Sequence, residues 1–229
     1  MTPERFTRLK AILDQRQMDL TVIMEDVHKP RNIAAIMRTC DAVGIHRLHA
    51  VAPKGVGIKR PKSAAGVLRY VRMQRHTDIR QALDTVRQQG CRVLVAHPGE
   101  QARDFRDYDY TQPTALLMGS ELIGVSEEAL READDTVTIP MHGMVASLNV
   151  SVSAALILYE AQRQRAAAGM YDTCRLDAAT YQQLLFEFAW PHLAHRYRSL
   201  GWDYPEIDLD TGSVDWQKPE NRGGRLLTE

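Results

Sequence analysis

The fold is decided by the stretch Ile139-Pro140-Met141-His142-Gly143-Met144-Val145-Ala146-Ser147-Leu148-Asn149-Val150-Ser151-Val152-Ser153-Ala154-Ala155. The residues before Pro140 predict a strand, and Gly143 permits the backbone shapes of a tight loop. A long helix is expected from about Ser147 to Ala168, where a glycine follows. A strand, a loop and a helix N-terminus in this order form a common ligand site in α/β folds. We therefore expect this loop to hold a cofactor, with Ser147 and Asn149 facing a substrate.

Strand and helix patterns alternate along the rest of the chain. Apolar runs predict strands at 20–24, 45–51, 70–74, 92–96, 114–118 and 136–139, and amphipathic patterns predict helices between them at 33–43, 78–89 and 126–131. This alternation predicts an α/β fold with a mostly parallel sheet that is covered on both faces. Further helices are expected at 4–16 and 178–200, the second broken at Pro191, followed by an irregular or disordered tail. We expect three regions: an N-terminal helical extension at 1–18, an α/β domain at 19–169, and a C-terminal helical extension with an acidic tail at 170–229.

The bulk composition is that of a globular protein. The 229 residues are 44% hydrophobic and 25% charged, which is enough for one α/β domain with a sizeable core. No apolar run approaches the roughly 18 residues of a membrane span, and the polar N-terminus does not resemble a signal peptide. The three cysteines, Cys40, Cys91 and Cys174, are far apart, and we expect buried free thiols in a cytoplasmic protein.

The formal net charge of zero conceals two opposite patches. The segment from Lys54 to Arg75 carries seven cations and no acid, while acids dominate the tail from Asp203 onward. A concentrated basic segment can bind phosphates even in a neutral chain. A solvated surface loop explains the same charges equally well.

The common nucleotide and metal fingerprints are absent from the sequence. There is no GxGxxG and no GxxxxGK[ST] pattern, which argues against a dinucleotide-dependent dehydrogenase and against a P-loop enzyme. His192 and His195 share a helix face without a third ligand type at metal spacing, so we expect no metal site.

Three polar clusters each follow the end of a predicted strand. They are Asn32 with Arg38, Gly119 with Glu121, and Ser147 with Asn149. Because the carboxyl ends of parallel strands share one edge of a sheet, these clusters are expected to converge. Each cluster alone has a plainer explanation: Asn32 or Ser147 as a helix cap, and Arg38 and Glu121 as a surface ion pair. The three together favour a functional site.

Three motifs make the chain resemble the SPOUT superfamily of S-adenosylmethionine-dependent RNA methyltransferases, and closely its TrmH-type tRNA guanosine ribose 2′-O-methyltransferases. The motifs are Asn32-Ile-Ala-Ala-Ile-Met-Arg38-Thr39 with Asp41-Ala-Val-Gly44, Leu117-Met-Gly119-Ser-Glu121-Leu-Ile-Gly124, and Ile139-Pro140-Met141 through Ser147-Leu148-Asn149-Val150-Ser151. Their order and spacing are highly specific. The resemblance fades after about Pro191.

The resemblance implies a fold, a cofactor and an assembly. The family fold is a parallel sheet with a deep trefoil knot, here flanked by N- and C-terminal helices, and the family dimerises through the knot region. S-adenosylmethionine would be held largely by main-chain groups at Ala96, Gly119, Ile139, Met141 and Leu148. Family members often carry a hydroxyl residue where this chain has Ala96, so only a backbone contact would survive there.

The resemblance also implies roles for the polar clusters. It assigns activation of the ribose hydroxyl to Arg38, but the pKa of arginine exceeds about 12, so a phosphate clamp and oxyanion stabiliser is the better interpretation. Asn32 and Glu121 would position neighbouring groups, and Ser147 and Asn149 would bind ribose or phosphate. RNA is expected to contact four further arginines, with the segment 54–75 extending that surface; they are Arg5, Arg8, Arg163 and Arg165.

The preferred hypothesis is therefore methylation of the guanosine ribose at position 18 of the tRNA D-loop. One alternative keeps the chemistry and moves it to another tRNA site or to ribosomal RNA. A second is a non-catalytic RNA-binding protein on the same fold, against which intact Arg38, Glu121 and Asn149 argue.

Overall fold

The computed structural model describes residues 1–52, 66, 69–99 and 102–216. The chain divides into two compact units, Gln17–Asp172 and a terminal unit of Met1–Arg16 with Thr173–Glu229. The short helix expected within the basic segment, and the end of the acidic tail, lie outside the described residues.

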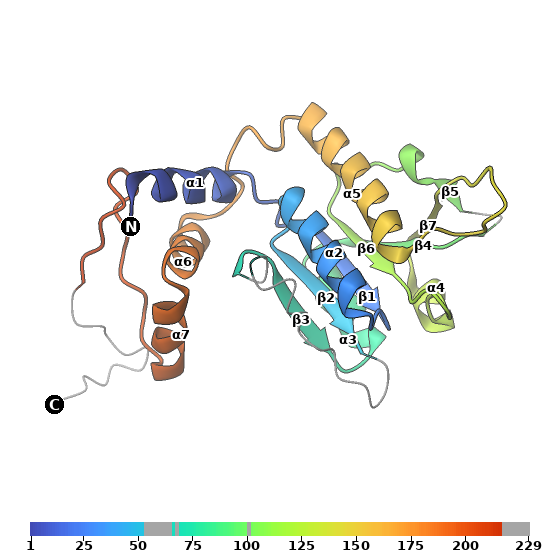
Figure 1. Cartoon of the computed structure of the whole chain (residues 1–229), viewed down its shortest axis with the longest axis horizontal. Coiled ribbons are helices and arrows are strands. Elements are labelled where there is room, and N and C mark those ends of the chain that lie inside the picture. Colours follow the sequence, from blue (N-terminus) through green and yellow to red (C-terminus); the bar gives the residue numbers. More distant parts are fainter. Residues whose placement is uncertain (53–65, 67–68, 100–101, 217–229) are drawn as a thin grey trace. The chain divides into compact units, whose positions relative to one another are not determined.

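One sheet of seven parallel strands organises the described part of the larger unit (Figure 1). Its strand order is β3-β2-β1-β6-β4-β7-β5. The strands are β1 (Leu20–Glu25), β2 (Arg47–Val51), β3 (Arg72–His76), β4 (Arg92–Ala96), β5 (Arg103–Asp104), β6 (Thr114–Met118) and β7 (Asp135–Thr138). The predicted parallel sheet is confirmed. The two-residue strand β5 and the 3-10 helix η3 (Phe105–Asp107) are too short to leave a periodic pattern in the sequence.

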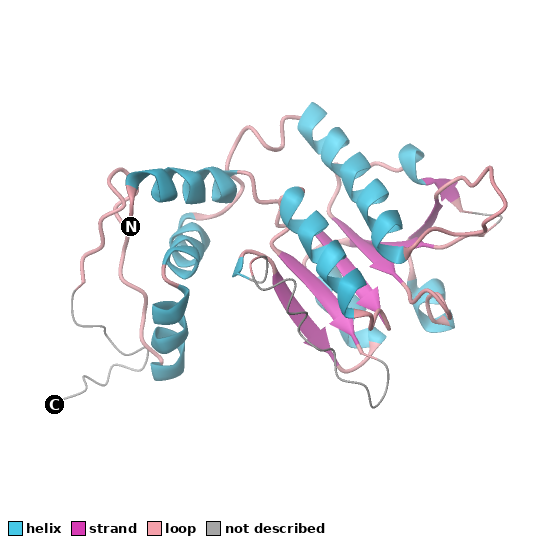
Figure 2. Cartoon of the chain, in the orientation of Figure 1, coloured by secondary structure: helices cyan, strands magenta, loops and turns pink. Residues whose placement is uncertain are grey.

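Helices cover both faces of this sheet (Figure 2). One core cluster joins one sheet face to α2 (Pro30–Ala42) and α5 (Val150–Ala167), and the other joins the opposite face to α3 (Ile79–Gln88) and α4 (Glu127–Glu132). Strands β1 and β6 are buried along their whole length, which matches their near-continuous apolar sequences.

Two helix starts differ from the sequence prediction, and both differences affect the site. Helix α2 begins at Pro30, because proline suits a first helical position, so Asn32 lies in the first turn and is not a cap. Helix α5 begins at Val150, and its cap is Asn149 rather than Ser147. The interpretation of Asn32 and Ser147 as helix caps is therefore wrong.

The strand register brings the candidate site together at one edge of the sheet. Met24 of β1 pairs with Met118 of β6, and Ala96 of β4 pairs with Val137 of β7. These strands therefore end side by side, and the loops that follow them meet, as parallel sheets require.

The terminal unit is built from α1 (Pro3–Asp14), α6 (Ala178–Ala189) and α7 (Pro191–Leu200). The break expected at Pro191 is confirmed, since α7 begins there. Residues 202–216 are irregular, yet they pack through buried Ile207 and through Tyr204, which stacks on Phe186.

Three remaining expectations concern the whole chain. Cys40 and Cys91 are buried, but Cys174 is exposed, so the prediction of buried thiols is wrong for that residue. None of the described helices is both long and apolar enough to cross a membrane. The trefoil knot stays a prediction.

Candidate active site

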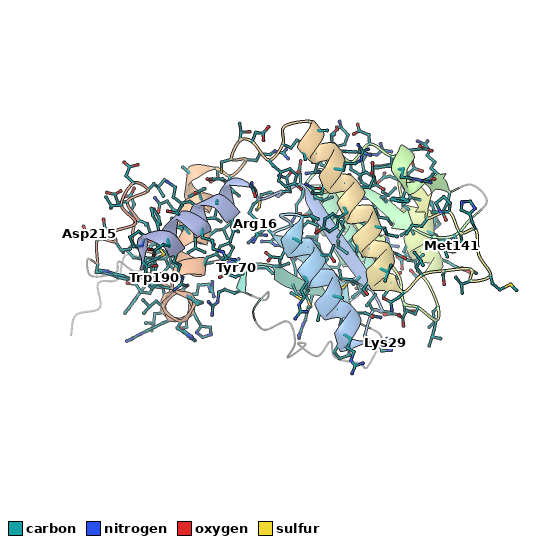
Figure 3. All side chains as sticks on the ribbon, turned by 45° about the horizontal axis from the view of Figure 1, so that its top comes forward. Arg16, Lys29, Tyr70, Met141, Trp190 and Asp215 are labelled. Atoms are coloured by element: carbon teal, nitrogen blue, oxygen red, sulfur yellow. The ribbon has the colours of Figure 1, made fainter. Side chains whose placement is uncertain are left out.

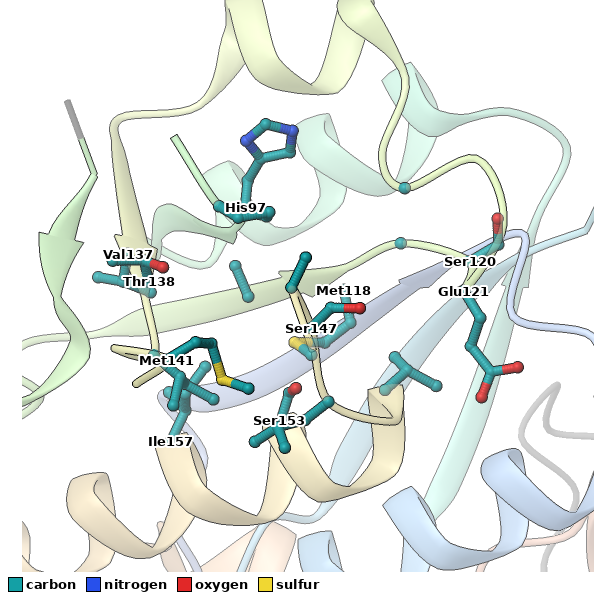
Figure 4. A pocket seen from close by; sticks show the side chains of 18 residues that line it. His97, Met118, Ser120, Glu121, Val137, Thr138, Met141, Ser147, Ser153 and Ile157 are labelled. Atoms are coloured by element: carbon teal, nitrogen blue, oxygen red, sulfur yellow. The ribbon is translucent and has the colours of Figure 1, made fainter. Parts of the chain in front are cut away.

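A cavity of about 260 Å³ lies at the carboxyl ends of β4, β6 and β7 (Figure 4). The loops that follow these strands form its wall, together with the first turns of α5. The structure places all five residues expected at the cofactor around this cavity: Ala96, Gly119, Ile139, Met141 and Leu148.

The cavity wall is mostly apolar, with polar groups at a few points. Met118, Met141 and Ile157 present apolar side chains, and Thr138, Ser147 and Ser153 add hydroxyl groups. Such a lining is typical of small-molecule sites, whose volumes are commonly about 300–1,000 Å³. The wall therefore suits a compact ligand that combines apolar surface with polar ends.

A tight turn at Gly119–Gly124 shapes one side of the cavity. The backbone N–H of Ser120 donates to the Gly124 carbonyl at 2.9 Å, and the Gly124 N–H donates back to the Ser120 carbonyl at 2.9 Å. A Cβ atom at Gly119 would lie 2.2 Å from the Gly124 carbonyl. Only glycine fits such a close approach, which explains the first glycine of this motif.

Three predicted site residues meet in one hydrogen-bonded cluster beside the cavity. Glu121 Oε1 accepts from Asn32 Nδ2 at 2.8 Å and from Asn149 Nδ2 at 2.5 Å. Asn149 Nδ2 also lies 3.3 Å from Asn32 Oδ1. The predicted convergence of the three strand-end clusters is confirmed for these residues, one from each cluster.

The carboxylate of Glu121 is held in its charged form. The contacting ammonium of Lys29 and the amide of Asn32 lower the pKa of Glu121 below its usual value. An ionised carboxylate only accepts hydrogen bonds, so both asparagine amides must turn their NH₂ groups toward it. This fixes Asn149 Oδ1 toward Ser151, whose N–H and hydroxyl donate to it at 2.9 and 2.6 Å.

The two other predicted catalytic residues are placed differently. Ser147 lines the cavity on the loop before α5. Arg38 is exposed on α2, almost two turns beyond Asn32, and it does not belong to the residues that line this cavity.

Arg165 is buried, contrary to its predicted contact with RNA. Its side chain is 0% exposed and forms an ion pair of 2.6 Å with Asp19. The same guanidinium donates to Gln17 Oε1 at 3.0 Å and to the Tyr110 carbonyl at 2.8 Å. The RNA-binding assignment is wrong for Arg165, because its donors are used inside the protein.

The other predicted RNA-binding arginines are exposed. Arg5 donates to the carbonyls of Phe188 and Ala189 at the end of α6, so part of its guanidinium is used within the terminal unit. Arg163 pairs with Glu160 one turn earlier in α5. Arg8 lies exposed on α1.

Some residues of the site were missed by the sequence analysis. Val150, Ser153 and Ile157 line the cavity at helical spacing, and a correct start for α5 would have indicated this face. Nothing in the sequence pattern singles out Lys29 as a partner of Glu121. In the described part of the chain, no group of three or more His, Cys, Asp or Glu side chains is arranged to hold a metal ion.

Comparison with known proteins places this geometry in a family. The SpoU rRNA Methylase family matches residues 19–159, which is more than half of the chain, and the C-terminal SpoU rRNA methylase region matches residues 163–215. The chain belongs to the SpoU rRNA methylase family.

Among SpoU relatives, the tRNA (guanosine(18)-2'-O)-methyltransferase of Escherichia coli K12 is 48% identical over 221 residues, which cover 94% of this chain and 96% of the relative. The crystal structure of the Aquifex aeolicus TrmH/SpoU tRNA modifying enzyme is similar, with a TM-score of 0.77 and 38% identity over 82% of this chain and 96% of that one. The SpoU methyltransferase AviRb from Streptomyces viridochromogenes, in complex with AdoMet, has a TM-score of 0.57 and 34% identity over 67% of this chain and 62% of that one.

Proposed function

We propose that this protein transfers a methyl group from S-adenosylmethionine to the ribose 2′-hydroxyl of guanosine 18 in the tRNA D-loop. The observation that carries the proposal is the 48% identity, over 94% of the chain, to a relative named for this reaction. The cavity beside the Glu121 cluster supports it, because it provides a small-molecule site next to polar groups suited to a ribose.

The cavity residues fit S-adenosylmethionine. A related SpoU methyltransferase is solved in complex with this cofactor. Main-chain groups at Ala96, Gly119, Ile139, Met141 and Leu148 would hold it. When bound, the cofactor supplies an electrophilic methyl group whose sulfonium becomes a neutral thioether, so the protein needs no general acid.

The polar cluster would position the ribose. Asn149 and Ser147 would bind the ribose or its phosphate, while Asn32 and Glu121 hold Asn149 in place. Arg38 would clamp a substrate phosphate and stabilise the negative charge that develops on the 2′-oxygen. As the 2′-oxygen is methylated, its proton would pass to the clamped substrate phosphate and from there to solvent.

We assign catalysis and tRNA binding to different regions of the chain. The domain at 19–169 would carry the methyl transfer, and the extensions at 1–18 and 170–229 would bind tRNA together with Arg163 of that domain. Arg8 on α1 and Arg163 on α5 are exposed cations suited to phosphate contacts. Because the proposed substrate is tRNA, we infer that the protein acts in the cytoplasm.

An apolar face on α5 favours a homodimer. Val152, Leu156 and Tyr159 lie on one stripe of the helix and are 46%, 42% and 53% exposed. Leu122 and Ile123, on the turn that forms the cavity, are also exposed. A second copy of the chain would cover this surface, and Leu156→Asp is expected to yield monomers in light-scattering measurements. A dimer that withstands this change would contradict the assigned face.

A substrate that lacks one atom tests the proposed function. Unmodified tRNA transcript should accept labelled methyl groups, and the same tRNA with 2′-deoxyguanosine at position 18 should accept none. Equal labelling of both RNAs would move the reaction to another tRNA nucleotide. Methyl transfer to ribosomal RNA and not to tRNA would show that ribosomal RNA, instead of tRNA, is the substrate.

A further inference from the structure

The N-cap of α2 is occupied by a residue that does not cap the helix. Lys29 has the extended backbone of a cap, with φ −68° and ψ 118°, but its side chain makes no capping hydrogen bond. Helix α7 also lacks a capping side chain, but five other helices begin with side chains that do cap: Thr2, Asp78, Ser126, Asn149 and Asp177. A lysine here gives up a stabilising cap, which a functional role would explain.

The side chain of Lys29 reaches toward the site instead. It lies at the start of α2 (Figure 3), and its ammonium contacts Glu121 Oε2. The other oxygen, Oε1, accepts from the amides of Asn32 and Asn149. Lys29 therefore binds one oxygen of the Glu121 carboxylate, and the two asparagine amides bind the other.

We propose that Lys29 is a positioning residue for methyl transfer, which holds the Glu121 carboxylate in place so that Asn32 and Asn149 keep the orientation the ribose requires. This inference rests on the proposed function. Lys29 acts through Glu121 and is assigned no contact with the reacting atoms.

The chemistry of the cluster explains how acid would disrupt it. A protonated Glu121 would present an O–H donor, and one of the asparagine NH₂ groups facing it would lose its acceptor. The amides would then turn or separate. The positive end of the α2 dipole also favours an anion at this position, and Lys29 adds a full charge there.

The effect should appear in turnover and not in folding. Lys29 is 56% exposed, and exposed ion pairs contribute little to stability. Losing the contact would misplace the ribose-binding amides, and small misplacements at a reacting centre can reduce rates by about 100-fold.

Lys29→Asn distinguishes a role in positioning Glu121 from a role in stabilising α2, because asparagine removes the cation and restores a good helix cap. We expect an unchanged or higher melting temperature, with kcat reduced about 10-fold to 100-fold and KM for tRNA changed far less. The acid limb of the kcat–pH profile should move to higher pH, since Glu121 loses the partner that most lowers its pKa. Lys29→Arg, which keeps the charge, should recover most of kcat.

Arg31→Asn provides the matched control. Arg31 is an exposed cation in the first turn of the same helix, and the structure gives it no contact with Glu121. This variant should keep the wild-type kcat and acid limb. Wild-type kcat and pH profile in Lys29→Asn would overturn the inference, as would a Lys29→Arg variant as impaired as Lys29→Asn. A wild-type protein that transfers no methyl to tRNA would instead reject the proposed function.

Discussion

At the scale of single residues, the space around Gly119 determines whether the cofactor cavity can form. A Cβ atom there would meet the Gly124 carbonyl at 2.2 Å, so the turn must open to accept alanine. We predict that Gly119→Ala weakens binding of S-adenosylmethionine at least about 10-fold, equivalent to about 1.4 kcal/mol and within the usual cost of overpacking. Isothermal titration calorimetry measures this directly.

Gly143 offers a matched comparison on the opposite loop. A Cβ atom at Gly143 meets nothing within 4 Å, so Gly143→Ala should bind the cofactor as the wild type does. Equal affinities of the Gly119→Ala and wild-type proteins would contradict the assigned role of the turn.

The buried pair His49 and His76 makes stability sensitive to acid. His49 Nδ1 lies 2.8 Å from His76 Nε2. Burial is the main cause that lowers the pKa of His49 to about 4, and the nearby His76 is the second cause. His49 Nε2 is buried without a hydrogen-bond partner among the described residues, so a proton there would be unsatisfied. Because the unfolded chain binds this proton near pH 6.5 and the folded chain does not, stability falls as the pH drops from 6.5 toward 4.

Urea unfolding at pH 7, 6 and 5 tests this prediction. The expected slope is at most about 1.4 kcal/mol per pH unit for one proton. His49→Gln should flatten the profile, whereas His192→Gln, at an exposed position of α7, should leave it unchanged. An identical slope in wild type and His49→Gln would contradict the account.

At the scale of elements, one buried arginine fixes the end of α5 to the sheet. Arg165 joins this helix to Asp19, which precedes β1, and to the Tyr110 carbonyl before β6. Arg165→Met is predicted to lower the free energy of unfolding by about 3–5 kcal/mol, because it leaves Asp19 without its partner. Arg163→Met, two residues earlier and exposed, should cost less than about 1 kcal/mol. Similar losses in urea titrations of the two variants would argue against this role for Arg165.

The contrast between Arg163 and Arg165 shows which features of the structure the sequence pattern does not predict. Alternating apolar runs predicted six of the strands and the parallel sheet, since periodicity directly reports burial. The pattern Arg163-Gln164-Arg165 contains no such signal, because a buried ion pair depends on residues more than 140 positions away. Both helix starts were displaced by about three residues: α2 begins at Pro30 instead of Ile33, and α5 begins at Val150 instead of Ser147.

At the scale of the whole molecule, the sequence predicted where the site lies better than which residues complete it. Parallel strands end at one edge, so Asn32, Glu121 and Asn149 were expected to converge, and they do. Lys29 was missed because its contact depends on the path of the turn after β6, which the sequence does not report. The terminal segments were expected as separate extensions, and in the structure Met1–Arg16 and Thr173–Glu229 form one unit.

The proposed homodimer gives Arg38 a role that mixing can test. Arg38 is exposed and does not line the cavity of its own chain, so we expect it to serve the site of the second subunit. Assayed with S-adenosylmethionine below the wild-type Kd, Arg38→Ala and Gly119→Ala should each keep no more than about a tenth of wild-type activity alone. Co-expressed at equal amounts, they should recover about a quarter of wild-type activity, because half of the dimers are mixed and each has one intact site. No recovery in purified mixed dimers would place Arg38 in its own subunit's site.

The most direct test of the central claim is to map the product. Purified protein would be incubated with labelled S-adenosylmethionine and unmodified tRNA transcript, and the RNA would then be digested to locate the labelled nucleotide. We predict a single 2′-O-methylguanosine at position 18. A label at another nucleotide, or no transfer by a folded protein that still binds tRNA, would contradict the account.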